Sequence, residues 1–471
     1  MGNSFAYLAL LAWPIIALFF YRHLEPLTAT FWTIVGGYLL LPVKVAIDFP
    51  LIPPMDKESI SALAAMAGML LVARRKVPLM PGKGIERWLF MVIMITPLIT
   101  VFNNPEPIYR ADGYLPGLTL HDAFSAIVNQ YLALVPFLLG LFLVRGSDDL
   151  LKLLKLLVVA GLCYTLPILF EIRLSPQLHT WIYGFFPHSF GQQFRFGGFR
   201  AVVFLGHGLL VATFIAVVLG AAALLWKQRI ATFGLPPGMV VLYLLLVLLL
   251  SKTVGAFVLG VMLFLMIVFA SVRLTTLLAR LLIAVVVLYP LLSIMDLFPH
   301  QALLDWAAVF DVQRAQSLGF RFMNELSLLA HAQEKFIFGW GGWGRNLLTG
   351  SVVDGYWIQV LGQYGLVGFV ALFALAFAAV FRGVKIIRYL PQQSEQQIVA
   401  GYVLMMAVVM VDQVPNHSMA NLYWLLIGGL SGAAHGIFKQ IRQQKKVSQN
   451  AVAGDAVQVS SLGGTTAKGA Q

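Results

Sequence analysis

Two arginines five residues apart stand out in a chain that has few charges. The segment 194–200 reads FRFGGFR, so Arg195 and Arg200 flank a pair of glycines, and His207-Gly208 follows. Guanidinium forks match the oxygens of a phosphate group, and glycines let the backbone approach a ligand closely. Alternatively, both arginines reach the membrane surface beside aromatic anchors. We favour phosphate binding, because the segment falls on the outer side of the topology derived below, where positive charge opposes the insertion bias.

A lysine interrupts apolar sequence in the segment SKTVGA, residues 251–256. A charge inside a membrane span costs roughly 2.5–3.5 kcal/mol on insertion scales, so it usually has a partner or a function. Lys252 is therefore a candidate for binding an anionic substrate. The cost shrinks if the ammonium group reaches the outer interface, and this second interpretation stays open.

The connection at 297–352 is the longest in the chain between apolar runs. Two of its stretches, Leu303–Phe310 and Phe320–Phe336, have the pattern of amphipathic helices. Long outer loops on a membrane scaffold are where binding and chemistry tend to occur. This one carries side chains suited to binding or proton transfer: Arg314, Arg321, Glu325 and His331.

The same loop contains FGWGGWGRN at 338–346, whose glycines exclude a regular helix. The ring faces of Trp340 and Trp343 suit stacking on sugars, and Arg345 suits an anion. Alternatively, the two tryptophans anchor this loop in the headgroup layer.

Asp354-Gly355 stands nine residues before the motif GLVG at 365–368. Asp354 could take a proton from an acceptor hydroxyl as a general base, and Glu325 and His331 are rival candidates. The structural alternative is that an aspartate near a helix N-terminus complements the helix dipole. No metal site is predicted, because the nine histidines show no pair four residues apart flanked by acids. The single cysteine excludes a disulfide framework.

The composition indicates the class of protein that carries these candidate residues. Charged residues make up 11% of the 471-residue chain and hydrophobic residues 59%, whereas a soluble domain carries about a quarter charged residues. Apolar runs long enough to cross about 30 Å of hydrocarbon recur throughout. We therefore predict an all-α integral membrane protein of about 13 transmembrane helices, at 4–21, 27–47, 59–73, 87–102, 121–144, 149–171, 200–225, 236–251, 254–271, 274–296, 353–381, 396–414 and 419–437.

The basic residues indicate the orientation. Most of the 32 lysines and arginines fall in alternate connections, and most of the acids fall in the others. Cytoplasmic loops of membrane proteins carry this excess of positive charge, so the net charge of +12 reports topology and not nucleic-acid binding. We expect an outer N-terminus, no cleavable signal peptide, and outer segments at 103–120, 172–199 and 297–352.

Four regions follow from this topology. We expect an N-terminal transmembrane bundle of about ten spans at 1–296 and a partly helical periplasmic loop at 297–352. C-terminal transmembrane helices would occupy 353–437. Residues 438–471 would form a disordered cytoplasmic tail, because the end of the chain is rich in Ser, Gly, Ala and Gln.

Together these motifs resemble the O-antigen ligase and O-antigen polymerase superfamily of bacterial surface-polysaccharide glycosyltransferases. That family has an arginine–glycine motif that opens a mid-chain span, a Ser-Arg-x-Gly-Ala-like motif that SKTVGA at 251–256 matches, and a long periplasmic loop with a Gly-x-Gly turn. After this loop, its ligases carry a histidine followed by Asn, Ser or Gln, then nine residues, and then Gly-x-x-Gly. This chain keeps the spacing but has Asp354 where ligases have histidine. The resemblance covers roughly residues 190–380.

The resemblance implies a metal-independent glycosyltransferase with a GT-C-like fold and no cofactor. Its substrate would be undecaprenyl-diphosphate-linked oligosaccharide at the periplasmic face of the bacterial inner membrane. Arg195 and Arg200 would bind the diphosphate, and Arg321 would stabilise the leaving group. The missing histidine favours polymerisation of O-antigen or exopolysaccharide repeat units over ligation to lipid A-core or protein.

Two other classes stay open. A transporter or flippase for a lipid-linked sugar would show internal repeats and charges at mid-membrane. A non-catalytic membrane component of polysaccharide secretion would explain the departures from the ligase motifs at Lys252 and Asp354. Expected partners are the lipid-linked glycan, membrane lipid, and a chain-length regulator or secretion proteins.

Overall fold

The computed structural model describes residues 2–48, 52–110 and 113–463, and they are mostly helical. A helix lies at each of the thirteen positions that the apolar runs predict. The elements are α1 (Ser4–His23), α2 (Pro26–Leu40), α3 (Lys57–Ala67), η1 (Gly68–Val72), α4 (Ile85–Phe102), β1 (Ile108–Arg110), β2 (Gly113–Leu115), α5 (Leu120–Leu143), α6 (Ser147–Leu174), α7 (Leu178–Tyr183), η2 (Gly191–Gln193), β3 (Phe194–Arg195), β4 (Gly198–Phe199), α8 (Gly208–Lys227), α9 (Pro237–Leu250), α10 (Val254–Phe269), α11 (Val272–Ile294), α12 (His300–Phe310), α13 (Val312–Glu334), α14 (Tyr356–Ile387), α15 (Gln393–Asp412) and α16 (Asn421–Gly463).

Eight of the described helices are long and apolar enough to cross a membrane: α1, α4, α5, α6, α8, α11, α14 and α15. Three more, α2, α9 and α10, are apolar but shorter. The prediction of a multi-pass helical membrane protein is thereby supported at this level, and the exact number of spans stays a prediction.

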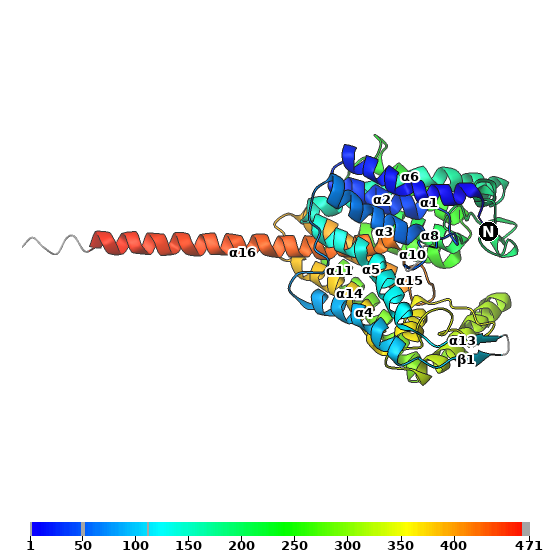
Figure 1. Ribbon diagram of the computed structural model, residues 1–471. Coiled ribbons are helices and arrows are strands. Elements are labelled where there is room, and N and C mark those ends of the chain that lie inside the picture. Colours follow the sequence, from blue (N-terminus) through cyan, green and yellow to red (C-terminus); the bar gives the residue numbers. More distant parts are fainter. Residues whose placement is uncertain (1, 49–51, 111–112, 464–471) are drawn as a thin grey trace, which may run out of the picture.

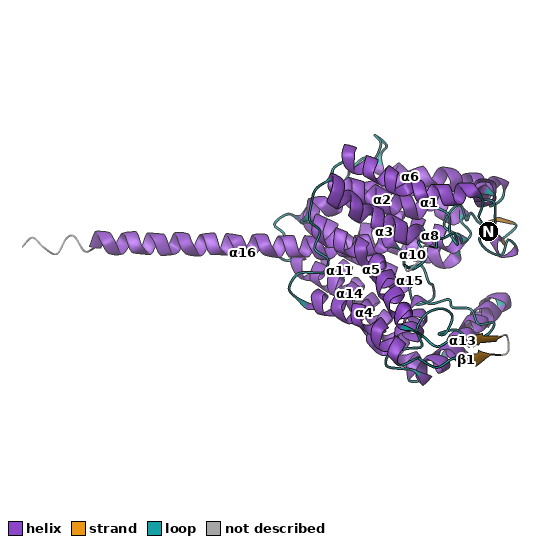
Figure 2. Cartoon of the chain, in the orientation of Figure 1, coloured by secondary structure: helices purple, strands orange, loops and turns teal. Residues whose placement is uncertain are grey.

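The bundle has two distinct ends. The N-terminus, α13 and β1 lie at one end, and α16 projects from the other (Figure 1). The strands of the described residues form two short hairpins, β1–β2 and β3–β4, which belong to the connections and not to the bundle (Figure 2). We call the end that holds α13 and β1 the loop end, and the opposite one the tail end.

Close backbone packing holds the centre of the bundle together. A methyl group at Gly428 of α16 would meet the carbonyl oxygen of Phe137 on α5 at 2.1 Å, and one at Gly140 would meet that of Leu425 at 2.4 Å. Small residues allow such close approach of helices in membranes. Nearly all of α8 is buried, so the element that follows the arginine motif is a central helix of the fold.

The sequence predicts a helix from residue 200, but α8 begins only at Gly208. The buried carboxylate of Glu171 accepts the backbone N–H groups of Val202 and Val203 at 2.7 and 2.8 Å, and Val203 has a φ of 47°. These bonds satisfy the backbone outside a helix, which a local apolar pattern does not reveal. The irregular segment lets Arg200 stand apart from the helix that follows it.

The long connection contains the two predicted helices, as α12 and α13. After α13 the chain pairs with α14 at a break in that helix, where Leu366 N–H donates to Phe336 O at 2.8 Å and Trp340 N–H donates to Gly362 O at 2.8 Å. Gly365 has a φ of +64° at the break, and a Cβ there would meet the Ile337 carbonyl carbon at 2.3 Å. The GLVG motif thus has a structural role, because it docks the long connection on α14.

The predicted disordered tail differs from the structure, in which α16 continues to Gly463. Its buried first part, from Leu422 to Ile437, packs in the bundle. Once a helix is nucleated, each further residue adds a hydrogen bond at little cost, and the Gln, Lys and Ala that follow are favourable helix formers.

Candidate active site

The FRFGGFR segment forms a tight hairpin at the loop end. Arg195 on β3 pairs with Gly198 on β4, and the two turn residues between them, Phe196 and Gly197, both have positive φ. Such a two-residue turn favours glycine, which explains the sequence pattern. The hairpin leaves Arg195 exposed to solvent, whereas Arg200 at its base is only 5% exposed.

Arg200 keeps part of its hydrogen-bonding capacity unused. Its Nη2 donates to Thr253 Oγ1 at 3.0 Å, while its buried Nε has no partner among the described residues. A buried guanidinium normally satisfies its donors, so this group is suited to an incoming anion. Burial, followed by the positive charges of Arg195 and Arg321, lowers the pKa of Arg200 to about 10. The positive charges of Arg195 and Arg321 therefore reach Arg200, which remains cationic at neutral pH.

The SKTVGA motif packs against the same hairpin. Lys252 Nζ donates to the carbonyl oxygen of Phe196 at 3.3 Å, and the next residue is the Thr253 that accepts from Arg200. Lys252 itself has a φ of 51°, in the connection between α9 and α10. Two motifs about fifty residues apart in sequence thus form one cationic surface.

His207 extends this surface to the start of the central helix. Its Nδ1 accepts the N–H of Leu209 at 3.0 Å and caps α8, and its ring lies 4.6 Å from that of His188. Burial and then the charge of Arg200 lower the pKa of His207 to about 3, with His188 and the other two arginines of the cluster adding to the effect. His207 is therefore neutral at physiological pH. The N-terminus of α8 adds the positive end of a helix dipole, which favours an anion.

Arg321 joins the long connection to this cluster and to Asp354. Arg321 Nε lies 3.8 Å from Asp354 Oδ2, and its Nη1 donates to Pro415 O at 3.4 Å. Burial raises the pKa of Asp354, and the charge of Arg321 lowers it in part. Among the described residues this is the only partner of the Asp354 carboxylate, so the group can accept a proton from a ligand.

Glu325 lies one helical turn after Arg321 on α13. The hydroxyl of Tyr289 donates to one carboxylate oxygen, and Trp357 Nε1 donates to the other at 3.3 Å. Burial raises the pKa of Glu325 to about 7, and the charge of Asp354 adds to this rise. Two predicted catalytic candidates, Asp354 and Glu325, thus lie together beside the predicted leaving-group cation.

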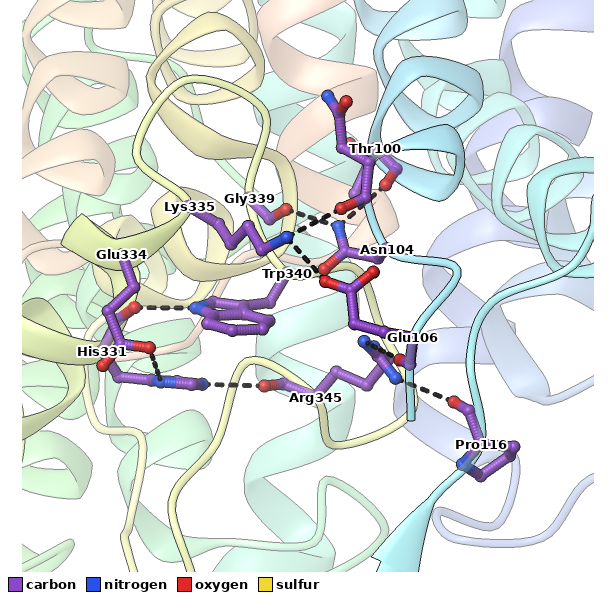
Figure 3. A network of polar contacts seen from close by, with 11 residues as sticks. Thr100, Asn104, Glu106, Pro116, His331, Glu334, Lys335, Gly339, Trp340 and Arg345 are labelled. Atoms are coloured by element: carbon purple, nitrogen blue, oxygen red, sulfur yellow. Dashed lines mark hydrogen bonds and ion pairs between the residues drawn. The ribbon is translucent and has the colours of Figure 1, made fainter. Parts of the chain in front are cut away.

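The third candidate base, His331, belongs to a different network (Figure 3). Its Nε2 donates to Arg345 O at 2.9 Å, and its ring stacks on Trp340 with centroids 4.5 Å apart. Arg345 is 1% exposed and donates to the carbonyl oxygens of Pro116 and Glu106 at 2.8 and 3.0 Å. These contacts tie the Gly/Trp segment to the connection before α5.

The structure therefore separates the sequence-predicted residues into two groups. Arg195, Arg200, Lys252, Arg321, Glu325 and Asp354 are joined by contacts or by electrostatic effects. The contacts of His331, Trp340 and Arg345 are those of a loop anchor. Trp343 is 49% exposed, and the side chain of Arg314 lies outside the described residues.

Sequence reasoning did not single out Tyr289 and Trp357, which hold Glu325, or Thr253, which holds Arg200. Thr253 lies inside the SKTVGA motif, so its position was a usable signal. Tyr289 lies in an apolar run and Trp357 in another, and no local pattern distinguishes them from core residues.

Neither a scan against protein-family models nor a search of curated proteins finds a match for this chain. The geometry of the arginine cluster and its two carboxylates is therefore what supports a functional proposal.

Proposed function

We propose that this chain is a metal-independent glycosyltransferase of the O-antigen polymerase and ligase type. It polymerises undecaprenyl-diphosphate-linked oligosaccharide repeat units at the periplasmic face of a bacterial inner membrane, within a GT-C-like arrangement of about 13 spans. The observation that supports this most is the buried guanidinium of Arg200, which Thr253 holds while its Nε stays unused and which the charges of Arg195 and Arg321 reach.

In this proposal the diphosphate of the donor lipid binds the three arginines. Departure of the lipid diphosphate breaks its bond to the anomeric carbon, and negative charge develops on the leaving oxygen. Preorganised cations stabilise such charge without reorganising, which is the largest single contribution in many enzymes. Lys252 and the α8 N-terminus add to the positive potential at the same place.

The acceptor hydroxyl forms the new bond to the anomeric carbon and gives its proton to Asp354. The carboxylate is suited to this because its contact with Arg321 is loose, at 3.8 Å. Glu325 holds its place through Tyr289 and Trp357 and, with a pKa of about 7, is partly protonated at neutral pH. It can take up a proton from the neighbouring carboxyl after transfer.

Ligation to lipid A-core or protein would use the same donor chemistry with another acceptor. The aspartate at the position where ligases have histidine favours polymerisation. A transporter or a non-catalytic component of polysaccharide secretion stays the alternative to this assignment.

The test uses the full chain in proteoliposomes with undecaprenyl-diphosphate-linked oligosaccharide and measures chain length by gel electrophoresis. We expect Arg195→Ala and Arg321→Ala each to abolish polymer while the protein still inserts. The matched control is Arg75→Ala, an exposed arginine between η1 and α4, which should leave chain length unchanged. Normal polymer from both cluster variants would overturn the assignment.

A further inference from the structure

A second cationic site lies far from the arginine cluster, at the tail end of the bundle. A cavity of about 1060 Å³ opens between the first residues of α11, the last turns of α14 and the start of α15. Lys385 of α14 lies over the ring of Phe438 on α16 at 5.9 Å, which locates the cavity near the point where α16 leaves the bundle. The connections on this side carry the excess of basic residues, so the positive-inside rule assigns it to the cytoplasm.

Four cations line this cavity, and none of its described lining residues carries a carboxylate. The cations are Arg273, Arg280, Lys385 and Arg388, and all four are exposed. Within the described part of the chain, none of them forms an ion pair with an acid. Concave sites lined by one sign of charge concentrate counter-ions, so this cavity selects an anion.

Arg280 lies unusually deep for a basic residue. It is eight residues after the first residue of α11, which places it roughly 12 Å along the axis of an apolar helix. A guanidinium at that depth in a span is costly unless it has a partner. An anion that enters from the membrane surface would supply this partner.

The apolar surroundings indicate what kind of anion fits. Phe381 and Val384 share the cavity wall with the cations. Beside the α11 residues that line the cavity, the neighbouring face of this helix carries exposed aliphatic side chains: Leu274, Leu277, Leu281, Val285 and Leu288. A headgroup phosphate among the cations would leave acyl chains against these side chains. A free phosphate ion would use the cations alone.

We propose that this cavity is a binding site for the phosphate headgroup of an anionic phospholipid of the adjacent leaflet. Basic pockets between transmembrane helices on the cytoplasmic side bind such headgroups by the same combination of charge and apolar surface. The site is separate from the proposed active site and does not depend on its function.

The experiment measures retention of phosphatidylglycerol by the full chain. Protein is reconstituted in phosphatidylcholine discs with and without phosphatidylglycerol, extracted, and examined by native mass spectrometry for bound lipid. We expect wild type to retain phosphatidylglycerol in preference to phosphatidylcholine. Arg273→Gln with Arg280→Gln should weaken this retention roughly thirtyfold, from about 1 kcal/mol per basic residue near an anionic surface.

Two matched variants make the test specific. Arg75→Gln with Lys76→Gln removes the same charge from exposed residues of another connection at the tail end and should leave retention unchanged. Arg273→Lys with Arg280→Lys keeps the charge and should preserve most of the binding. This variant keeps the proposal testable if the glutamine variant does not fold. Equal retention by wild type and the folded glutamine variant, or equal loss in the control, overturns the proposal. Displacement of the lipid by an equal concentration of inorganic phosphate would show a simple anion site and overturn the lipid assignment.

Discussion

Arg200 and Thr253 are joined by a hydrogen bond of 3.0 Å between Nη2 and Oγ1, although 53 positions separate them in the sequence. This bond connects the arginine hairpin before α8 to the connection between α9 and α10. It fixes the direction of a buried guanidinium whose Nε is left for another partner. The relationship explains why both motifs occur in one chain, because neither alone would position the cation.

Thr253→Val removes the hydroxyl and keeps a similar shape. We expect the polymerisation rate to fall roughly tenfold to a hundredfold, because small displacements of a positioning group have effects of this size. The rate is measured as repeat units added per minute in proteoliposomes. Thr28→Val, at an exposed hydroxyl near the start of α2, is the control and should leave the rate unchanged. A wild-type rate in Thr253→Val would show that Arg200 does not need this bond.

Asp354→Asn tests the base. Removing a general base typically lowers a rate by about two to four powers of ten, so we expect loss of turnover with donor binding retained. The control Asp305→Asn changes an exposed aspartate of α12, which has Gln301 as its partner, and should leave turnover intact. Full activity in Asp354→Asn would transfer the role to Glu325.

Glu325 should make stability depend on pH. Its folded-state pKa of about 7 lies above the value of 4.5 for an unperturbed glutamate, so the folded protein binds this proton more tightly than the unfolded chain does. The carboxyl therefore favours folding at low pH, and its contribution declines as the pH rises from about 4.5 to about 7. The melting temperature of wild type minus that of Glu325→Gln should therefore fall as the pH rises from about 4.5 to about 7. A constant difference between wild type and Glu325→Gln from about pH 4.5 to about pH 8 would contradict the raised pKa.

Gly365→Ala tests how the long connection is held. A side chain at φ +64°, with its Cβ 2.3 Å from the Ile337 carbonyl carbon, is strained, so we expect a loss of about 1–3 kcal/mol in the free energy of unfolding. Thermal unfolding in detergent measures it. Gly342→Ala has open space around its Cβ and should change stability little. Equal stability of the two variants would mean that the docking of the connection on α14 has been misassigned.

Local patterns predicted the helices well, because apolar runs and amphipathic stretches report burial directly. The sequence patterns also singled out the arginines of the candidate site, because charged residues are rare in this chain. They missed the irregular residues 200–207, because the buried Glu171 that satisfies this backbone lies about thirty positions earlier. Sequence reasoning also could not foresee that Arg345 donates to carbonyl groups of the connection before α5, or that His331 donates to Arg345 O. Glu325 was a candidate, but the environment that raises its pKa depends on tertiary packing.

In the proposed mechanism, Arg195 and Arg321 act together on one diphosphate. The most direct measurement is a double-mutant cycle for binding of undecaprenyl diphosphate to the full chain in detergent, with Arg195→Gln, Arg321→Gln and the double variant. We predict that each single variant weakens binding, and that the loss in the double variant departs from their sum by about 0.5 kcal/mol or more. Unchanged binding in both single variants, or strictly additive losses, would contradict the account.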